Sequence, residues 1–210
     1  MTPSLPFKAV AIAAMILAAG CASALAPVLK PNVSAEATAL RDGAYELDKT
    51  HAALHFKIDH LGFSEFVGRF ERFDASLDFD AETPQAARID AVIDMASLDI
   101  ANDEFAATLM GPDWFDAGAF PEAVFRSTAI EVTGDNTGVM TGEMTLHGVT
   151  APVSFDVTFN GGGNDRLRRA YIVGFSATAV IDRMAFGVDR FKGLIADDVI
   201  IEIEAEFIRK

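Results

Sequence analysis

The stretch "DVIIEIEAEFIR", Asp198 to Arg209, alternates apolar and acidic side chains along most of its length. Every second position from Val199 to Phe207 is apolar, and Glu202, Glu204 and Glu206 stand between them. Successive side chains of a strand point to opposite faces. This period of two therefore predicts a β-strand with one apolar and one solvated face.

The same period occurs in four other stretches. They are "DASLDFDAE" (74–82), "RIDAVIDMAS" (88–97), "APVSFDVTFN" (151–160) and "AYIVGFSATAVID" (170–182). Turn-forming residues separate the strands, in "ETPQ", "GDNTG", "HGVTAP" and "NGGGNDR". We interpret Gly161 to Gly163 in the last of these as a flexible hairpin loop, because neither a helix start nor a Gly-Lys-Ser/Thr element follows to make a phosphate cradle.

One interval, residues 97–123, lacks the alternation and is rich in Ala and Glu. It predicts a short helix from about Asn102 to Met110, ended by Gly111 and Pro112. The residues that follow, including Trp114, predict an aromatic loop.

About eight to ten antiparallel strands in a domain of this size fit a sandwich or a closed barrel. Closure removes exposed strand edges, and an eight-stranded barrel is wide enough to hold one small ligand. We therefore predict an all-β fold, a closed antiparallel barrel with one short helix between strands.

Charge and aromatic content narrow the function. Lys and Arg number 17 against 31 Asp and Glu, so the field of the surface repels polyanions and nucleic-acid binding is excluded. The chain has 17 Phe but only 2 Tyr and 1 Trp, which means that most aromatic surface carries no hydrogen-bonding group. Such a lining suits hydrocarbon better than sugars or bases.

The segment "KIDHLGFSEFVGRFERF", Lys57 to Phe73, could be the wall of a pore or part of a filled core, and its alternation permits both. Gly62 and Gly68 within it predict points where the strand bends or is approached closely. The inward faces of the strands together predict nine pore-lining, ligand-binding residues. These are Phe56, Phe66, Phe70, Phe79, Ile93, Met95, Phe155, Phe175 and Ile201.

The N-terminus has the pattern of a secretory signal, with Lys8, an apolar run and then "LAAGC" ending at Cys21. We predict a signal peptide with a lipobox over residues 1–21, a flexible tether over 22–42 and the barrel domain over 43–210. Lipidation of Cys21 would tether the exported protein to the outer membrane, facing the periplasm. Ordinary cleavage after the Ala-x-Ala at 22–24 is the alternative.

Catalytic and metal-binding signals are weak. His51 and His55 could share a strand face, but no third ligand follows at a recognisable spacing, and no Gly-x-Ser-x-Gly nucleophile elbow occurs. We therefore predict no catalytic residues, no metal site and no cofactor. Two alternatives remain open: an enzyme that acts on an isoprenoid or lipid through His60 or His147, and a structural envelope protein with a filled core.

Four ordered blocks resemble the YceI-like family. They are "YELDKTHAALHFKIDHLGFSEFVGRFERFDASLDFD", "WFDAGAFPEAVFRSTAI", "TGEMTLHGVTAPVSFDVTF" and "FSATAVIDRMAFGVDRF". The resemblance implies an exported, lipocalin-like barrel that holds a polyisoprenoid, such as a quinone, or a related amphiphilic lipid in its pore. Many members carry Arg-Asp-x-His-Leu on the helix, where this chain has "FAATL", and that departure favours a more apolar ligand. The sequence is compatible with a homodimer.

Overall fold

The computed structural model describes residues 29–36 and 39–210. The predicted signal peptide, with Cys21, lies outside the described residues, as does part of the predicted tether. None of the helices among the described residues is long and apolar enough to span a bilayer.

The described residues form ten strands. They are β1 (Gly43–His60), β2 (Ser64–Phe70), β3 (Phe73–Phe79), β4 (Arg88–Asp94), β5 (Leu98–Asp99), β6 (Glu122–Val132), β7 (Thr137–Leu146), β8 (Val149–Asp165), β9 (Ala170–Asp182) and β10 (Asp198–Arg209). Three short 3-10 turns join them: η2 (Pro84–Ala86), η3 (Met95–Ser97) and η4 (Arg183–Phe186).

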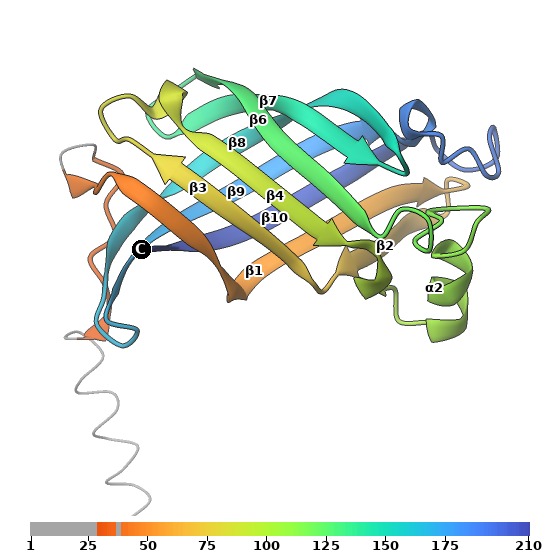
Figure 1. The fold of residues 1–210 in the computed structure, drawn as a ribbon, viewed down its shortest axis with the longest axis horizontal. Coiled ribbons are helices and arrows are strands. Elements are labelled where there is room, and N and C mark those ends of the chain that lie inside the picture. The colour runs from red at the N-terminus through yellow and green to blue at the C-terminus, as the bar shows by residue number, and fades with distance from the viewer. Residues whose placement is uncertain (1–28, 37–38) are drawn as a thin grey trace, which may run out of the picture.

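Eight of these strands close into an antiparallel barrel (Figure 1). The order runs β10-β9-β8-β7-β6-β4-β3-β1, and β1 pairs with β10 to complete the ring. Closure gives both edges of each strand a hydrogen-bonding partner over most of its length. The predicted closed antiparallel barrel is confirmed.

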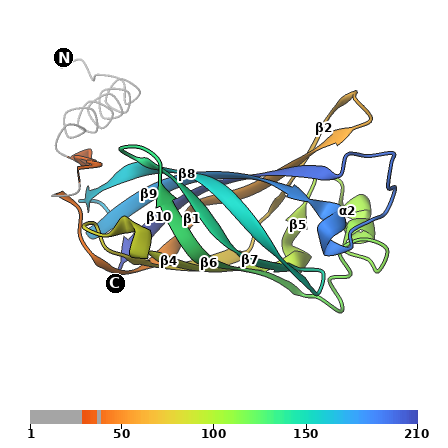
Figure 2. The same cartoon turned by 90° about the horizontal axis from the view of Figure 1, so that it is seen from above.

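Strand β1 is long enough to take part in both the barrel and a hairpin that extends beyond it. Its first residues, Gly43–Glu46, pair with β3, whereas His55–His60 pair with β2. Strand β2 pairs in turn with the two-residue β5, outside the ring. The hairpin of β1 and β2 consequently projects beyond one end of the barrel (Figure 2).

The predicted helix is confirmed as α2 (Asp103–Leu109), which lies at the same end of the barrel as this hairpin (Figure 2). Asn102 caps it, because its side chain accepts a hydrogen bond from the backbone N–H of Phe105. Asp103 and Glu104 place negative charge in the first turn, where the helix dipole favours it. We call this end of the molecule the α2 end.

The prediction of a hairpin loop at Gly161 to Gly163 is wrong. These glycines lie inside β8 and pair with β9, next to a bulge between Phe159 and Gly161. Residues 32–34 lie against the strand here, and Ser34 and Gly162 form an antiparallel bridge with backbone hydrogen bonds of 3.0 and 2.8 Å. A Cβ atom on Gly163 would lie 2.7 Å from the carbonyl oxygen of Asn32. The glycines therefore admit a close backbone approach instead of forming a turn.

A second cluster of buried side chains lies toward the end opposite α2. Tyr45 and Val173 are fully buried there. The Tyr45 hydroxyl donates to the carbonyl of Arg41, and the Tyr171 hydroxyl donates to that of Ala39 at 3.1 Å. Burial raises the pKa of Tyr45 to about 12, so this hydroxyl remains a donor at neutral pH. Both tyrosines of the chain thus hold residues 39–41 against the barrel.

Candidate functional site

The interior of the barrel contains a cavity of about 730 Å³. Its lining extends from the loop between β6 and β7 at one end to α2 and the loops beside it at the other. The wall between is almost entirely aliphatic and phenylalanyl, because each strand of the ring turns the apolar half of its alternation inward. The volume lies within the range of ordinary small-molecule sites.

All nine residues predicted to line a pore do line this cavity. They are Phe56 on β1; Phe66 and Phe70 on β2; Phe79 on β3; Ile93 on β4; Met95 on η3; Phe155 on β8; Phe175 on β9; and Ile201 on β10. Their placement follows from the period of two. That they bind a ligand stays a prediction.

Gly68 shows how the wall is built. The rings of Phe56 and Phe70 lie 5.9 Å apart, and a Cβ atom on Gly68 would come within 2.3 Å of the Phe56 ring and 2.7 Å of Ile100. The predicted close approach at Gly68 is confirmed. Gly62, with φ of +75°, forms the turn between β1 and β2.

The sequence did not identify several of the residues that line the cavity at the α2 end. Phe105 and Leu109 come from α2, Trp114 and Phe115 from the aromatic loop, and Phe191 from the segment after η4. These segments have no period that could assign an inward face. The aromatic residues that cluster after Gly111 were the signal available in the sequence, but they did not show which side chains would face the cavity.

A buried arginine fixes the loop that contains Phe191. Arg183 is only 4% exposed, and its guanidinium donates to the carbonyls of Val188, Arg190 and Ala196. The ring of Trp114 then packs against Phe191 with 5.8 Å between ring centres. One buried cation thus holds the 188–197 loop in place beside the cavity.

Polar groups contact the cavity only near its two ends. Asp59, His60 and Arg183 line it at the α2 end, and Asp135, Asn136 and Thr137 line it at the other. His147, the second histidine considered for catalysis, instead bonds through Nδ1 to the carbonyl oxygen of Phe186 at 3.2 Å. It fixes the backbone beside η4.

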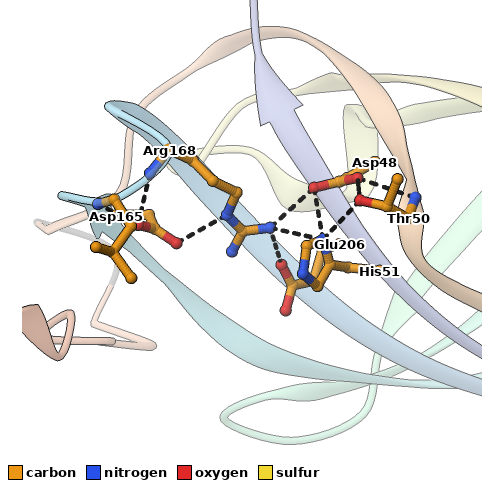
Figure 3. Close-up of polar contacts among 7 residues, drawn as sticks. Asp48, Thr50, His51, Asp165, Arg168 and Glu206 are labelled. Carbon is orange, nitrogen blue, oxygen red and sulfur yellow. Dashed lines mark hydrogen bonds and ion pairs between the residues drawn. The ribbon is translucent and has the colours of Figure 1, made fainter. Parts of the chain in front are cut away.

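A separate group of polar side chains joins β1, β10 and the turn between β8 and β9 (Figure 3). Arg168 donates through Nη1 to Asp48 at 2.8 Å and to Glu206 at 2.7 Å, and through Nε to Asp165 at 2.7 Å. His51 Nδ1 lies 2.9 Å from Asp48. Together these residues form what we call the Arg168 network.

The Arg168 network explains the charges of its members. Burial alone would raise the pKa of Asp48, but hydrogen bonds from Thr50, His51 and Arg168 outweigh it and hold that pKa well below its usual range. Ligand atoms of Asp48, His51 and Glu206 lie within 4.8 Å of one another, a spacing that a metal could use. The guanidinium already supplies the positive charge among them. His55, paired with His51 in the sequence analysis, is not part of the group.

Comparison with known proteins places these features in context. A family model described as "YceI-like domain" matches residues 45–207. A UPF0312 protein of Pseudomonas savastanoi pv. phaseolicola is 37% identical over 168 residues, covering 79% of this chain and 86% of that protein. A UPF0312 protein of Pseudomonas putida (strain W619) is 37% identical over 170 residues, with the same coverage.

Three solved structures have the same architecture. Burkholderia cenocepacia BcnA matches with a TM-score of 0.70 and 27% identity, over 76% of this chain and 98% of that one. A Campylobacter jejuni YCEI protein matches with a TM-score of 0.63 and 28% identity, over 73% and 91%. A polyisoprenoid binding domain from Saccharophagus degradans gives 0.56 and 14%, over 79% and 98%, which shows the fold alone.

Proposed function

The chain belongs to the YceI-like family, and from that premise we propose that it binds one polyisoprenoid or related amphiphilic lipid inside its barrel. One observation carries the proposal: the cavity of about 730 Å³ has a continuous apolar wall contributed by every strand of the ring. The polyisoprenoid binding domain from Saccharophagus degradans has the same barrel fold, and this supports the ligand class.

The energetics favour a long apolar chain. Burying about twenty methylene groups at about 0.8 kcal/mol each gives roughly 16 kcal/mol gross, which exceeds typical costs of immobilising a ligand. A charged group in the middle of the cavity would lose its hydration and find no partner there. We therefore propose that the ligand has a hydrocarbon tail in the lumen and that its polar group lies at an end.

The α2 end limits what kind of polar group the ligand carries. Helix α2 presents Phe105 and Leu109 to the cavity, so this helix offers a headgroup no charged partner. The nearby polar lining consists of Asp59, His60 and Arg183, and the guanidinium of Arg183 already donates to the carbonyls of the 188–197 loop. A neutral headgroup that accepts or donates hydrogen bonds, such as that of a quinone, fits this end better than a phosphate, which Asp59 would repel.

We further propose that the protein acts by binding and not by catalysis. His60 and His147, the candidates for acid or base, have separate environments, one on the cavity lining and one bonded to the carbonyl of Phe186. Gln keeps a hydrogen-bonding side chain at both positions, so replacing both histidines by Gln should preserve lipid uptake. Turnover of an isoprenoid that this double substitution abolished would overturn the assignment.

Export and anchoring are part of the same proposal. The "LAAGC" element supports a periplasmic protein that is lipidated at Cys21 and held at the outer membrane. Labelling cells with a radioactive fatty acid tests this: the label should appear on the wild-type protein and not on Cys21→Ser. Equal labelling of both would contradict lipidation at this residue.

Native mass spectrometry tests the lipid-binding proposal directly. Protein purified without added lipid should carry one lipid per chain, and delipidated protein should take up a polyprenyl quinone. Ala177→Phe places a ring into the lumen and should lower uptake at least tenfold, since Ala177 lines the cavity. Thr178→Phe, the exposed neighbour on β9, is the matched control. Only the apo mass, together with no quinone uptake by the wild type, would sink the proposal.

A further inference from the structure

Large apolar side chains are exposed together at the α2 end. We call them the apolar rim: Leu61, Phe63, Val67, Phe105, Phe191 and Leu194. Phe63 is 86% exposed and Leu194 is 63% exposed. Every phenylalanine that is classed as exposed among the described residues belongs to this rim. Apolar side chains gathered in this way mark an interaction surface, whereas single exposed ones need no explanation.

Three segments bring the rim together. The β1–β2 hairpin projects past the barrel, with α2 and the 188–197 loop at the same end (Figure 2). Phe66 of the hairpin contacts Phe105 of α2 edge to face at 6.0 Å, and Trp114 contacts Phe191 at 5.8 Å. All four of these aromatic residues line the cavity. The rim is therefore continuous with the lining of the proposed lipid site.

Two residues of the apolar rim have a left-handed backbone conformation. Leu61 has φ of +60° beside Gly62, and Phe191 has φ of +56° two residues before Gly193. A non-glycine residue in this region of backbone conformation is strained, and such residues cluster at functional sites. The β1–β2 hairpin and the 188–197 loop thus each contain a large apolar residue in a strained backbone conformation.

The charges around the rim select the partner. Arg190 pairs with Asp113 at 3.8 Å and lies over the ring of Phe191, and Lys192 stands between Phe191 and Leu194 in the sequence. Asp59 and Glu65 stand before and after the tip of the β1–β2 hairpin in the sequence. Both signs are present, and the whole chain has a net charge of −14. This pattern suits a zwitterionic lipid surface and disfavours an anionic one.

We propose that the apolar rim docks onto a zwitterionic phospholipid bilayer, inserting Phe63 and Leu194 below the headgroups so that the α2 end of the cavity faces the membrane. Amphipathic surfaces insert their apolar side chains to this depth in the interface. The docking stands on the rim itself and goes beyond the proposed function. Only its purpose, the passage of a lipid between bilayer and barrel, rests on that function.

The opposite end of the molecule provides the contrast. Residues 39–41 are held there by Tyr45 and Tyr171. Leu167 is 71% exposed in the turn after β8, among charged residues of the Arg168 network, and no exposed phenylalanine accompanies it. Leu167→Ser is therefore a matched control for Leu194→Ser at the rim.

Vesicle binding tests the proposal in the full chain with Cys21→Ser as the common background, so that no lipid anchor contributes to binding. Phosphatidylcholine vesicles without isoprenoid should carry the wild-type protein upward in a flotation gradient. Trp114, the only tryptophan of the chain, contacts Phe191 and should be quenched by phosphatidylcholine brominated on its acyl chains. Phe63→Ser with Leu194→Ser should weaken binding at least tenfold, since one buried Phe or Leu side chain supplies about that factor. Leu167→Ser should bind as the wild type does.

Salt and lipid charge give a second readout. Replacing part of the phosphatidylcholine by phosphatidylglycerol should weaken binding at low ionic strength, and added salt should restore it. Binding that required the anionic lipid would overturn the proposal. So would equal binding by the wild type and the double variant, or no binding by either.

Two further measurements separate the alternatives. Sedimentation of the wild type as a dimer that the double variant breaks, without any vesicle binding, would assign the rim to a second copy and overturn the docking. Quinone uptake from a solvent stock should be the same in the wild type and the double variant. Vesicle binding without quinone uptake would support docking and refute the proposed ligand, so the two failures are distinguishable.

Discussion

Asp48 is a buried carboxylate whose charge depends on a few donors. The hydrogen bonds from Thr50, His51 and Arg168 keep its pKa below the ordinary value of 3.8. A depressed pKa means that the unfolded chain binds the proton more readily, so this stabilisation is present above about pH 4 and is lost as pH falls further. Asp48→Asn should therefore lower the free energy of unfolding by about 1 to 3 kcal/mol at pH 7.

Urea unfolding across pH measures this effect. The difference between wild type and Asp48→Asn should shrink as pH falls from about 4 to about 2. Asp78→Asn, an exposed carboxylate on β3, should change stability by less than about 0.5 kcal/mol at each pH. A difference that stayed constant down to the lowest pH would show that Asp48 contributes through shape and not through its charge.

At the same scale, the limits of sequence-based prediction are visible in single residues. Phe155 and Ile201 were placed correctly because alternation fixes the face of a strand once one side is known to be apolar. Phe105 and Phe191 were missed because their segments have no such period. The contact between Asp48 and Arg168, 120 residues apart, leaves no local signal in the sequence.

At the scale of elements, the N-terminal segment and β8 are coupled. Glycine is common in hairpin turns, so the run Gly161 to Gly163 indicated a turn. The structure shows that residues 32–34 approach these glycines closely, which is a second reason for a residue without a side chain. Gly163→Ala should push residues 32–34 away, because its Cβ atom would lie 2.7 Å from the Asn32 carbonyl oxygen. The Ser34 amide, which donates to Gly162, should then exchange its hydrogen at least tenfold faster.

Gly174→Ala is the control for this prediction. Gly174 pairs with Gly161 across the strands, but a Cβ atom there meets only Asn160 at 3.6 Å, an ordinary contact. Hydrogen exchange at Ser34 should remain as in the wild type, and the barrel amides should stay protected in both variants. Unchanged exchange in Gly163→Ala would mean that the segment can shift without losing its bonds to β8.

At the scale of the molecule, the sequence indicated which side chains face inward but not whether they enclose a cavity. Alternation says which side chains face inward, whereas the space between them depends on the number of strands, their tilt and their closure. Those are set by pairings such as β1 with β10, whose residues lie far apart in the chain. A filled core and an open lumen were therefore equally compatible with the segment from Lys57 to Phe73, and the cavity distinguishes them.

A hollow apolar barrel should gain stability from whatever fills it. Side chains that face an empty space lack packing contacts, and a ligand bound only by the folded state adds about 2.7 kcal/mol at a hundredfold excess over its dissociation constant. Delipidated protein should thus unfold at a lower urea concentration than protein reloaded with a polyprenyl quinone. The slope of the unfolding free energy against urea concentration should be the same in both. Ala177→Phe should lose this shift, while Thr178→Phe should keep it, because only Ala177 lines the cavity. If quinone stabilised both variants equally against urea, the stabilising ligand would bind on the outer surface, because a ring in the lumen would not have displaced it.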